Sequence, residues 1–204
     1  MAPSEQVTIP ELPLPLRWLG RPQAWESGEG ALRISAGPRS DLFVDPAGSI
    51  STDVETPPML VCEPSGDFTL SARISVDFAS TYDAGVLVLF RDALSWAKLC
   101  FERSPNGDPM VVSVVNRRVS DDCNHFAVAG RQIWFRIARG GDCFAFHASA
   151  DGALWRLVRY FALDDAAGIS VGFEAQSPTG EGCSVTFDEI RYEARRLADL
   201  RCGG

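Results

Sequence analysis

One short run of residues combines groups that can bind a polar ligand. In SWAKLCFERS (95–104), one set of alternate positions includes Trp96, Lys98 and Glu102, whereas the other is filled by Ala, Leu and Phe. Successive side chains of a β-strand point to opposite faces, so a strand here would present an indole, an ammonium and a carboxylate together. An indole stacks on the apolar side of a pyranose ring, and charged groups hydrogen-bond the ring hydroxyls. This pattern is typical of a sugar-binding face.

Two further runs have the same parity. In QIWFRIAR (132–139), Trp134 and Arg136 alternate with Ile and Phe, and in GISVGFEAQS (168–177), Glu174 and Gln176 alternate with Val, Phe and Ala. If these strands share a sheet, their polar faces come together. The sequence then predicts one ligand-binding face formed by Trp96, Lys98, Glu102, Asn116, Trp134, Arg136, His147, Glu174 and Gln176.

Two other interpretations of this face stay open. Glu102 and Glu174 are a candidate acid and base for glycoside cleavage, which requires carboxyl groups about 5–5.5 Å apart for retention or about 6.5–9.5 Å apart for inversion. Alternatively, the face is a solvated sheet surface with cross-strand ion pairs, Lys98 with Glu102 or Arg136 with Glu174. Each such pair contributes less than about 1 kcal/mol.

The remaining candidates for chemistry are few. The chain has no GxGxxG, P-loop, HExxH or GxSxG motif. His125 falls in DDCNHF, which reads as a solvated polar loop, and His147 is expected to join a polar face or to be a hydrogen-bonded bystander. The oxygens of DDCN (121–124) suit Ca²⁺ but lack the EF-hand spacing, which favours a solvated loop. We therefore expect no metal and no cofactor.

Six cysteines are scattered along the chain without a CxxC pair. Three of them, Cys100, Cys143 and Cys183, fall within strand-like runs, where a free thiol behaves as a small apolar residue. Cys202 lies near the end in RCGG and is expected to be exposed. Most of the six are expected to be reduced.

Short runs of period two must position these residues. The clearest is GDFTLSARISVDF (66–78), in which apolar side chains alternate with polar ones. Turn sequences such as SPNGD and SPTGEG separate the runs. No amphipathic helix and no repeat of constant period is evident. Similar runs lie at 31–36, 41–45, 59–63, 84–92, 95–103, 108–118, 132–139, 142–149, 153–163, 168–177 and 182–193. About twelve strands predict an all-β fold, a two-sheet antiparallel β-sandwich of the jelly-roll type.

The 204 residues suffice for one domain of this kind. Residues 1–22 contain five prolines, which disfavour helix and central strand alike. This segment is expected to lie extended on the surface, held by Leu12, Leu14, Leu16 and Trp18. We expect a single β-sandwich domain over residues 23–195 and a tail over residues 196–204.

Composition and charge limit the partners. Hydrophobic residues are 46% and charged residues 23% of the chain, as in ordinary globular proteins. The net charge of −8, with no basic run longer than a pair such as Arg117–Arg118, argues against nucleic acid. No apolar run is long enough to cross a membrane, and the first residues lack the features of a secretory signal. We expect a cytoplasmic protein whose partner is a carbohydrate or small molecule, with a protein partner or a homodimer as alternatives.

Several stretches resemble the DUF1349 family. They are YDAGVLVLFRD (82–92), SWAKLCFE (95–102), VVSVVNRRVSDD (111–122), IWFRIARGGDCFAFHASADGALWRLVR (133–159) and GISVGFEAQSPTGEGCSVTFDEI (168–190). The combination of WxKxxxE with SxDGxxW is the most specific part. The resemblance implies the concanavalin A-like lectin/glucanase sandwich, in a family that includes fungal proteins described as regulators of enolase.

The same resemblance bears on activity. The superfamily binds or cleaves glycans, but this chain has no match to the ExDxxE strand of laminarinase-like glucanases, since LCFERSPNG has no second carboxylate two residues after Glu102. A related sandwich is an accessory domain of some xylosidases. The resemblance therefore implies binding or structural duty rather than catalysis, with a regulatory, protein-binding role as a further alternative.

Overall fold

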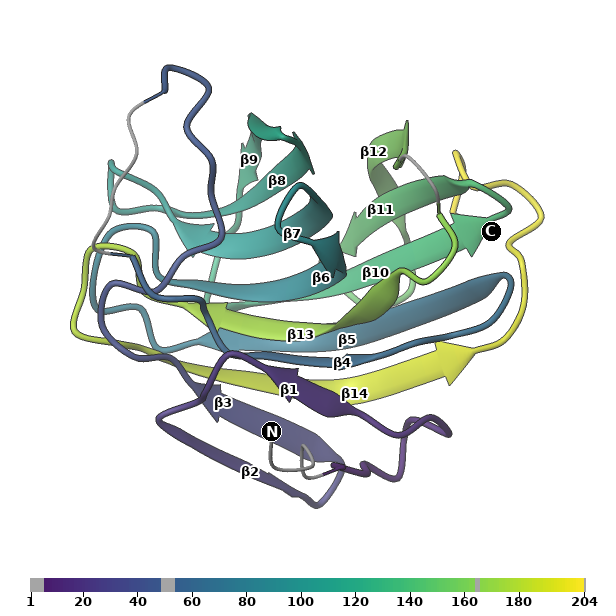
Figure 1. Ribbon diagram of the computed structural model, residues 1–204, viewed down its shortest axis with the longest axis horizontal. Coiled ribbons are helices and arrows are strands. Elements are labelled where there is room, and N and C mark those ends of the chain that lie inside the picture. The colour runs from purple at the N-terminus through teal and green to yellow at the C-terminus, as the bar shows by residue number, and fades with distance from the viewer. Residues whose placement is uncertain (1–5, 49–53, 164–165, 204) are drawn as a thin grey trace.

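The computed structural model describes residues 6–48, 54–163 and 166–203. These residues form fourteen strands in two seven-stranded antiparallel sheets packed face to face (Figure 1). Sheet I has the order β1 (Arg17–Leu19), β4 (Met59–Cys62), β13 (Ser170–Gln176), β6 (Ala84–Asp92), β7 (Ser95–Arg103), β8 (Pro109–Arg117) and β9 (Val119–Ala127). Sheet II has the order β12 (Arg156–Ala162), β11 (Cys143–Ser149), β10 (Gln132–Gly140), β5 (Phe68–Val76), β14 (Ser184–Glu193), β3 (Ala31–Ser35) and β2 (Ala24–Gly28). The predicted all-β jelly-roll sandwich is confirmed.

Alternation within the strands builds the core between the sheets. In β5, the apolar positions from Phe68 to Val76 are buried, whereas the residues between them include Ser71 and Arg73, which are half-buried. The rings of Phe173 from sheet I and Phe187 from sheet II meet with centroids 5.0 Å apart. Burial of these inward faces supplies the main stabilisation of the fold.

Eleven of the twelve predicted strands exist, with ends shifted by a few residues. Residues 41–45 are the exception, because this segment leaves the sheets and crosses the outer face of sheet I. Three strands, β1, β2 and β9, were missed by the sequence pattern.

The strand β9 corrects the interpretation of DDCNHF as a loop. It is the edge strand of sheet I, and most of its side chains are exposed, so its sequence lacks the apolar alternation of a half-buried strand. His125 lies on this strand, half-buried, with Nε2 2.9 Å from the hydroxyl of Ser113. Burial lowers the pKa of His125, and Arg159 adds to the effect.

The proline-rich N-terminal segment joins the sandwich. Val7 and Leu16 pair through two backbone hydrogen bonds of 2.9 Å, and Leu16 is fully buried. The short strand β1 then pairs with β4. Leu12 is buried and Trp18 packs against the core, so these side chains hold the segment, and β1 lies within sheet I ahead of the expected domain start at residue 23.

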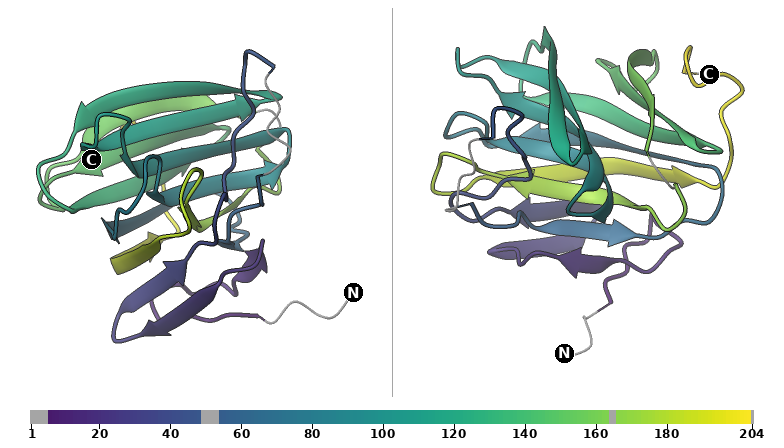
Figure 2. Two further views of the ribbon diagram at one scale, coloured as in Figure 1. Left: turned by 90° about the vertical axis from the view of Figure 1, so that its left-hand side faces the viewer. Right: turned by 45° about the horizontal axis from the view of Figure 1, so that its top comes forward.

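The C-terminal segment, residues 194–203, packs on sheet II. Leu197 and Leu200 form a small apolar cluster with Ala138 and Ala145 on the outer face of this sheet. Figure 2 shows the C-terminal segment rising beside the strands of sheet II. The described residues include no helix long and apolar enough to cross a membrane.

All six cysteines are free. Cys62, Cys100 and Cys183 are buried, Cys143 is half-buried, and Cys123 and Cys202 are exposed.

Candidate functional site

The predicted site residues divide between the two sheets. The outer face of sheet I carries Trp96, Lys98 and Glu102 from β7, Asn116 from β8, and Glu174 and Gln176 from β13. The outer face of sheet II carries Trp134 and Arg136 from β10 and His147 from β11. The expectation of one shared face is therefore wrong. Parity identifies which side chains point away from the core, but it does not say to which sheet a strand belongs.

The group on sheet II fastens the C-terminal segment. Nη2 of Arg136 donates to the carbonyl of Gly203 at 2.5 Å, and its guanidinium carbon lies 4.4 Å from the centre of the Trp155 ring. Nε2 of His147 lies 2.8 Å from the carbonyl oxygen of Leu200. Burial lowers the pKa of His147 to about 4, against the opposing effect of this hydrogen bond. Arg136 and His147 therefore have structural partners within the chain.

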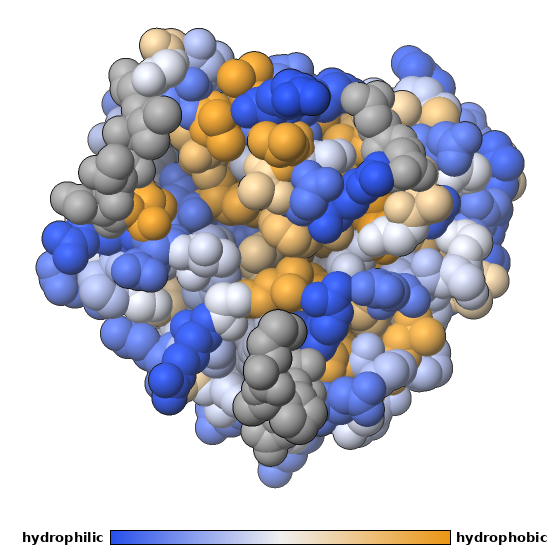
Figure 3. Space-filling view, viewed as in Figure 1, coloured by the Kyte–Doolittle hydropathy of each residue, from blue (hydrophilic) through white to orange (hydrophobic). Residues whose placement is uncertain are grey.

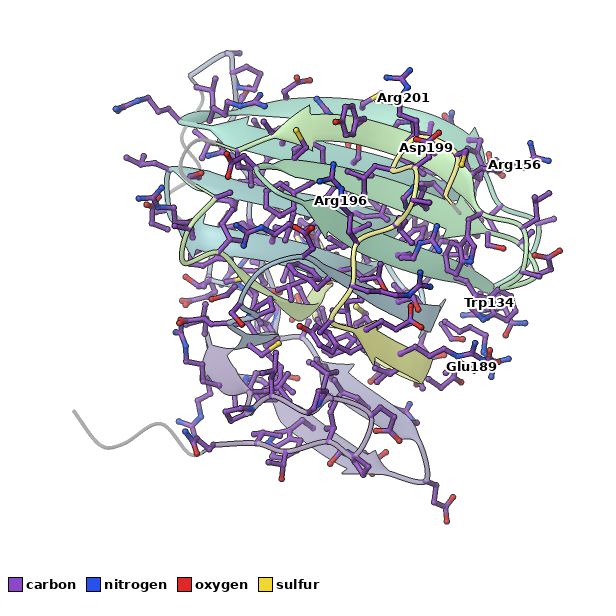
Figure 4. The ribbon with its side chains drawn as sticks, turned by 90° about the vertical axis from the view of Figure 1, so that its right-hand side faces the viewer. Trp134, Arg156, Glu189, Arg196, Asp199 and Arg201 are labelled. Carbon is purple, nitrogen blue, oxygen red and sulfur yellow. The ribbon has the colours of Figure 1, made fainter. Side chains whose placement is uncertain are left out.

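Trp134 lies at the edge of the same region. Its indole Nε1 donates to a carboxylate oxygen of Glu189 at 3.0 Å, and the guanidinium carbon of Arg73 lies 5.4 Å from its ring centre. Figure 4 shows Trp134 and Glu189 together, apart from the C-terminal segment that carries Arg196, Asp199 and Arg201. A small cavity of about 210 Å³ lies between Trp134 and Trp155.

A larger cavity of about 330 Å³ lies on the outer face of sheet I. Its floor is part of the sheet, and its walls come from β9, from the turn before β6 and from the segment 41–44. The residues that line it are Asp41, Phe43, Tyr82, Lys98, Glu102, Pro105, Val112, Val114, Asp122, Asn124 and Gln176. Only three of the nine predicted site residues are among them, namely Lys98, Glu102 and Gln176.

Strand register sets the width of the floor. Lys98 of β7 pairs with Val114 of β8, which pairs with Asp122 of β9. Because neighbouring strands are about 4.8 Å apart, Lys98 and Asp122 flank a floor about 10 Å wide. Val112 and Val114 form the apolar middle of this floor. The cavity thus has an apolar base bordered by polar side chains.

Lys98 organises one wall. Its Nζ donates to Oδ1 of Asp41 at 2.9 Å and to Oε1 of Gln176 at 2.8 Å. Nε2 of Gln176 in turn donates to the carbonyl of Tyr82 at 3.3 Å. Burial opposes the charged form of Lys98, but the neighbouring carboxylates, Asp41 foremost, outweigh it and raise the pKa of the ammonium. The ion-pair partner of Lys98 is therefore Asp41. The pair with Glu102 that the sequence suggested does not form.

Glu102 faces the cavity without a partner. It is nine-tenths buried, and within the described part of the chain no group donates a hydrogen bond to its carboxylate. Burial raises the pKa of Glu102 to about 8, although the charge of Lys98 lowers it in part. Asp122, across the floor, has a raised pKa for the same main reason.

The other predicted residues of sheet I lie beneath the surface. Trp96 and Glu174 are fully buried and do not line the cavity. Burial raises the pKa of Glu174 to about 7, and neither of its carboxylate oxygens has a hydrogen-bond partner among the residues that the structure describes. Asn116 is also buried and donates to the carbonyl of Leu94 at 3.0 Å. In this geometry Trp96 has no free ring face to stack on a sugar, and Glu102 and Glu174 do not face the cavity as a pair.

Exposed aromatic rings reach the cavity from elsewhere. Tyr82 is 38% and Phe43 is 42% exposed, and both line it. Tyr82 has a φ of 68°, in the left-handed region that costs a residue with a side chain about 1–2 kcal/mol. The adjacent buried Asp83 holds this turn by accepting hydrogen bonds from the backbone N–H groups of Ala79 and Ser80.

Sequence reasoning missed five of the lining residues with polar or aromatic groups. They are Asp41, Phe43, Tyr82, Asp122 and Asn124. Three come from segments outside the sheet and two from the edge strand β9. The run 41–45 was expected to be a strand of a sheet, and neither the turn at Tyr82 nor β9 shows clean alternation. The cluster of turn residues in ASTYDAG (79–85) was the available signal for Tyr82.

The segment 41–44 lies across the outer face of sheet I. Asp41 contacts Lys98 on β7, and Val44 exchanges hydrogen bonds with Ser120 on β9, 2.9 Å each. Figure 3, which shows the face seen in Figure 1, has apolar side chains in its upper middle, over the region where Figure 1 draws β6 to β8. Leu42, Phe90 and Met110 pack there on the buried outer-face cluster of sheet I.

Within the described ranges, no group of three or more His, Cys, Asp or Glu residues is arranged to hold a metal ion.

Comparison with solved structures shows the same fold in proteins of several kinds. A functionally unknown protein from Saccharomyces cerevisiae is 24% identical, with a TM-score of 0.81 over 89% of this chain and 97% of its own. The GH43 protein BlXynB (K247S mutant) from Bacillus licheniformis is 16% identical, with a TM-score of 0.71 over 94% of this chain but only 38% of its own. The carbohydrate-binding module CBM66 from Bacillus subtilis is 14% identical, with a TM-score of 0.54 over 86% of this chain and 94% of its own.

Comparison of sequences gives the family. Among curated proteins, no sequence matches this chain. Residues 18–195, however, match a family described as "Protein of unknown function (DUF1349)". That match covers the sandwich from β1 to the end of β14, including the cavity on sheet I, and the chain therefore belongs to the DUF1349 family.

Proposed function

We propose that this protein binds a carbohydrate or a sugar-like metabolite, without converting it, in the cavity on the outer face of sheet I. The observation that carries the proposal is the composition of this cavity. An apolar floor lies between polar side chains, and two partly exposed aromatic rings stand beside it. Sugar sites combine these elements, because a pyranose has apolar ring faces and a rim of hydroxyls.

Each group has a role in this proposal. The ring of Tyr82 supplies the stacking surface that Trp96 cannot supply. Glu102, Asp122 and Asn124 supply hydrogen-bonding groups around the rim. Lys98 holds Asp41 and Gln176 in position, since both of its side-chain hydrogen bonds go to these residues. The fully buried Glu174 takes no direct part.

The volume and the structural neighbours support the same proposal. About 330 Å³ lies at the lower end of the range of small-molecule sites, which suits one sugar ring better than a long chain. Sandwiches of similar fold occur in a carbohydrate-binding module and in GH43 proteins. This likeness concerns the fold, and the assignment to this chain depends on its own cavity.

The test is glycan binding by the Tyr82→Ala variant. Loss of a stacking ring costs about 0.5–1.5 kcal/mol beyond the lost contact area, so we expect affinity to fall roughly tenfold, measured by titration calorimetry on glycans selected from an array. The control is Tyr160→Ala, because Tyr160 is 42% exposed but lies on sheet II. Equal affinity of both variants and the parent protein would place binding elsewhere, and absence of any glycan binding would refute the proposal.

A further inference from the structure

The cavity on sheet I contains more negative than positive groups. Its lining includes three carboxyl groups, on Asp41, Glu102 and Asp122, but one ammonium, on Lys98. That ammonium is already used, because Lys98 donates to Asp41 and Gln176. Among the described residues, the carboxyl groups of Glu102 and Asp122 form no ion pair, and the positive charges of Lys98 and Arg159 act on Asp122 only at longer range.

Of these two carboxyl groups, that of Glu102 points more clearly to a ligand. Its side chain is nine-tenths buried, yet it borders the cavity and has no hydrogen-bond donor among the described residues. Its oxygens are not among the fully buried unpartnered atoms, so they are open to the cavity and can accept from a ligand there.

We propose that the cavity selects a hydroxylated ligand carrying a primary ammonium group, such as an amino sugar, and that Glu102 receives the ammonium while Asp122, across the floor, attracts it at longer range. This inference rests on the proposed function and names its ligand class. An ammonium can donate to the Glu102 carboxylate and to other acceptors of the cavity, and hydrogen bonds between charged groups are about twice as strong as neutral ones. A neutral hexose would leave Glu102 with only neutral donors, and a uronate would be repelled.

The protonation state of Glu102 gives this proposal a specific signature. The pKa of free Glu102 is raised to about 8 by burial, so at pH 6 its carboxyl is protonated. A bound ammonium favours the ionised form, and the carboxyl proton then passes to the buffer as the N–H···O bond forms. The charged or titratable groups that face Glu102 across the cavity or along its strand are Lys98, Cys100, Asp41, Asp122 and Tyr82.

The experiment is titration calorimetry of the full chain at pH 6 with glucosamine, galactosamine and mannosamine, each beside its parent hexose. We expect at least one hexosamine to bind about tenfold more tightly than its parent, as the difference between charged and neutral hydrogen bonds implies. Repeating the titration in buffers of different ionisation enthalpy should show release of roughly one proton per hexosamine bound and none per hexose.

Substitutions of Glu102 and Asp122 test whether these residues cause the hexosamine preference and the proton release. Glu102→Gln should abolish both the hexosamine preference and the proton release. Asp122 is exposed, so Asp122→Asn leaves the buried structure unchanged and should reduce the hexosamine preference several-fold. Glu26→Gln is the control, because Glu26 is exposed on β2 of the other sheet. Retained preference in both cavity variants would overturn the inference.

The parent sugars separate this inference from the proposed function. If a hexose binds as tightly as its hexosamine in this cavity, the ammonium preference is wrong while sugar binding stands. If none of the six sugars binds, the inference is also overturned, and the glycan array then decides on the proposed function by itself.

Discussion

At the scale of single residues, the outer face of sheet I contains buried charge that its neighbours only partly balance. Lys98 is 2% exposed and is paired with Asp41, whereas Glu174 is fully buried with both oxygens unpartnered. A carboxyl group in such a place is stable mainly in its neutral form. Its presence therefore costs stability once the pH is high enough to ionise it.

This gives a prediction for Glu174→Gln. The pKa of Glu174 is raised to about 7 in the fold, above its unfolded value, so folding takes up a proton between about pH 4.5 and 7 and stability falls as pH rises through that window. The amide cannot ionise. We therefore expect the change in the free energy of unfolding caused by the substitution to be roughly 1–3 kcal/mol more favourable at pH 8 than at pH 5. Urea denaturation at both pH values measures this. A pH-independent effect of the substitution would contradict it.

At the scale of the elements, the close approach of the two sheets depends on a glycine in β6. Gly85 faces the core, and a Cβ there would lie 2.6 Å from side-chain atoms of both Ile74 on β5 and Val185 on β14. These neighbours are β-branched and have little rotamer freedom. The sheets would have to separate locally to accommodate a methyl group.

We therefore expect Gly85→Ala to lower the free energy of unfolding by about 1–3 kcal/mol, the usual cost of an overpacked core. The matched control is Gly28→Ala on β2, where a Cβ would meet nothing within 4 Å. Thermal denaturation of both variants compares them, and equal melting temperatures would show that the core yields without cost.

The elements also show what the sequence could predict. Strand β5 and its inward side chains were predictable because alternation reports burial directly. Sheet membership was not, because β9 and β10 follow one another in the chain yet lie in different sheets, and sequential strands are neighbours only about two-thirds of the time. This is why Trp134 and Arg136 were assigned to the wrong face. Two cavity walls were missed because Phe43 lies in a run that was assigned to a strand, and Tyr82 lies in a turn without a periodic signal.

At the scale of the whole molecule, buried titratable groups set the pH range of greatest stability. Glu102 and Glu174 have raised pKa values, about 8 and about 7, so they reduce stability as pH rises above about 4.5. His147 has a pKa lowered to about 4, so its contribution is lost as pH falls from about 6.5 towards 4.

The glutamates lower stability as pH rises, and His147 lowers it as pH falls. The free energy of unfolding is therefore expected to be greatest near pH 5–6 and to decline up to about pH 8.5. Urea midpoints measured from pH 4 to pH 9 test this expectation. The Glu102→Gln and Glu174→Gln double variant should flatten the alkaline decline while leaving the acid limb, which His147 controls, in place. An optimum at pH 8 or above would show that these groups ionise freely in the fold.

The segment 41–44 has a consequence for the shape of what can enter the cavity. It is fixed at both ends, to Lys98 by Asp41 and to Ser120 by Val44, and it separates the cavity from the part of the sheet that holds Trp96 and Asn116. An open cleft lets a polymer pass through with both ends free, whereas this barrier closes one side of the cavity. If the proposed function holds, we expect a chain end or a free monosaccharide to be bound in preference to the middle of a polysaccharide.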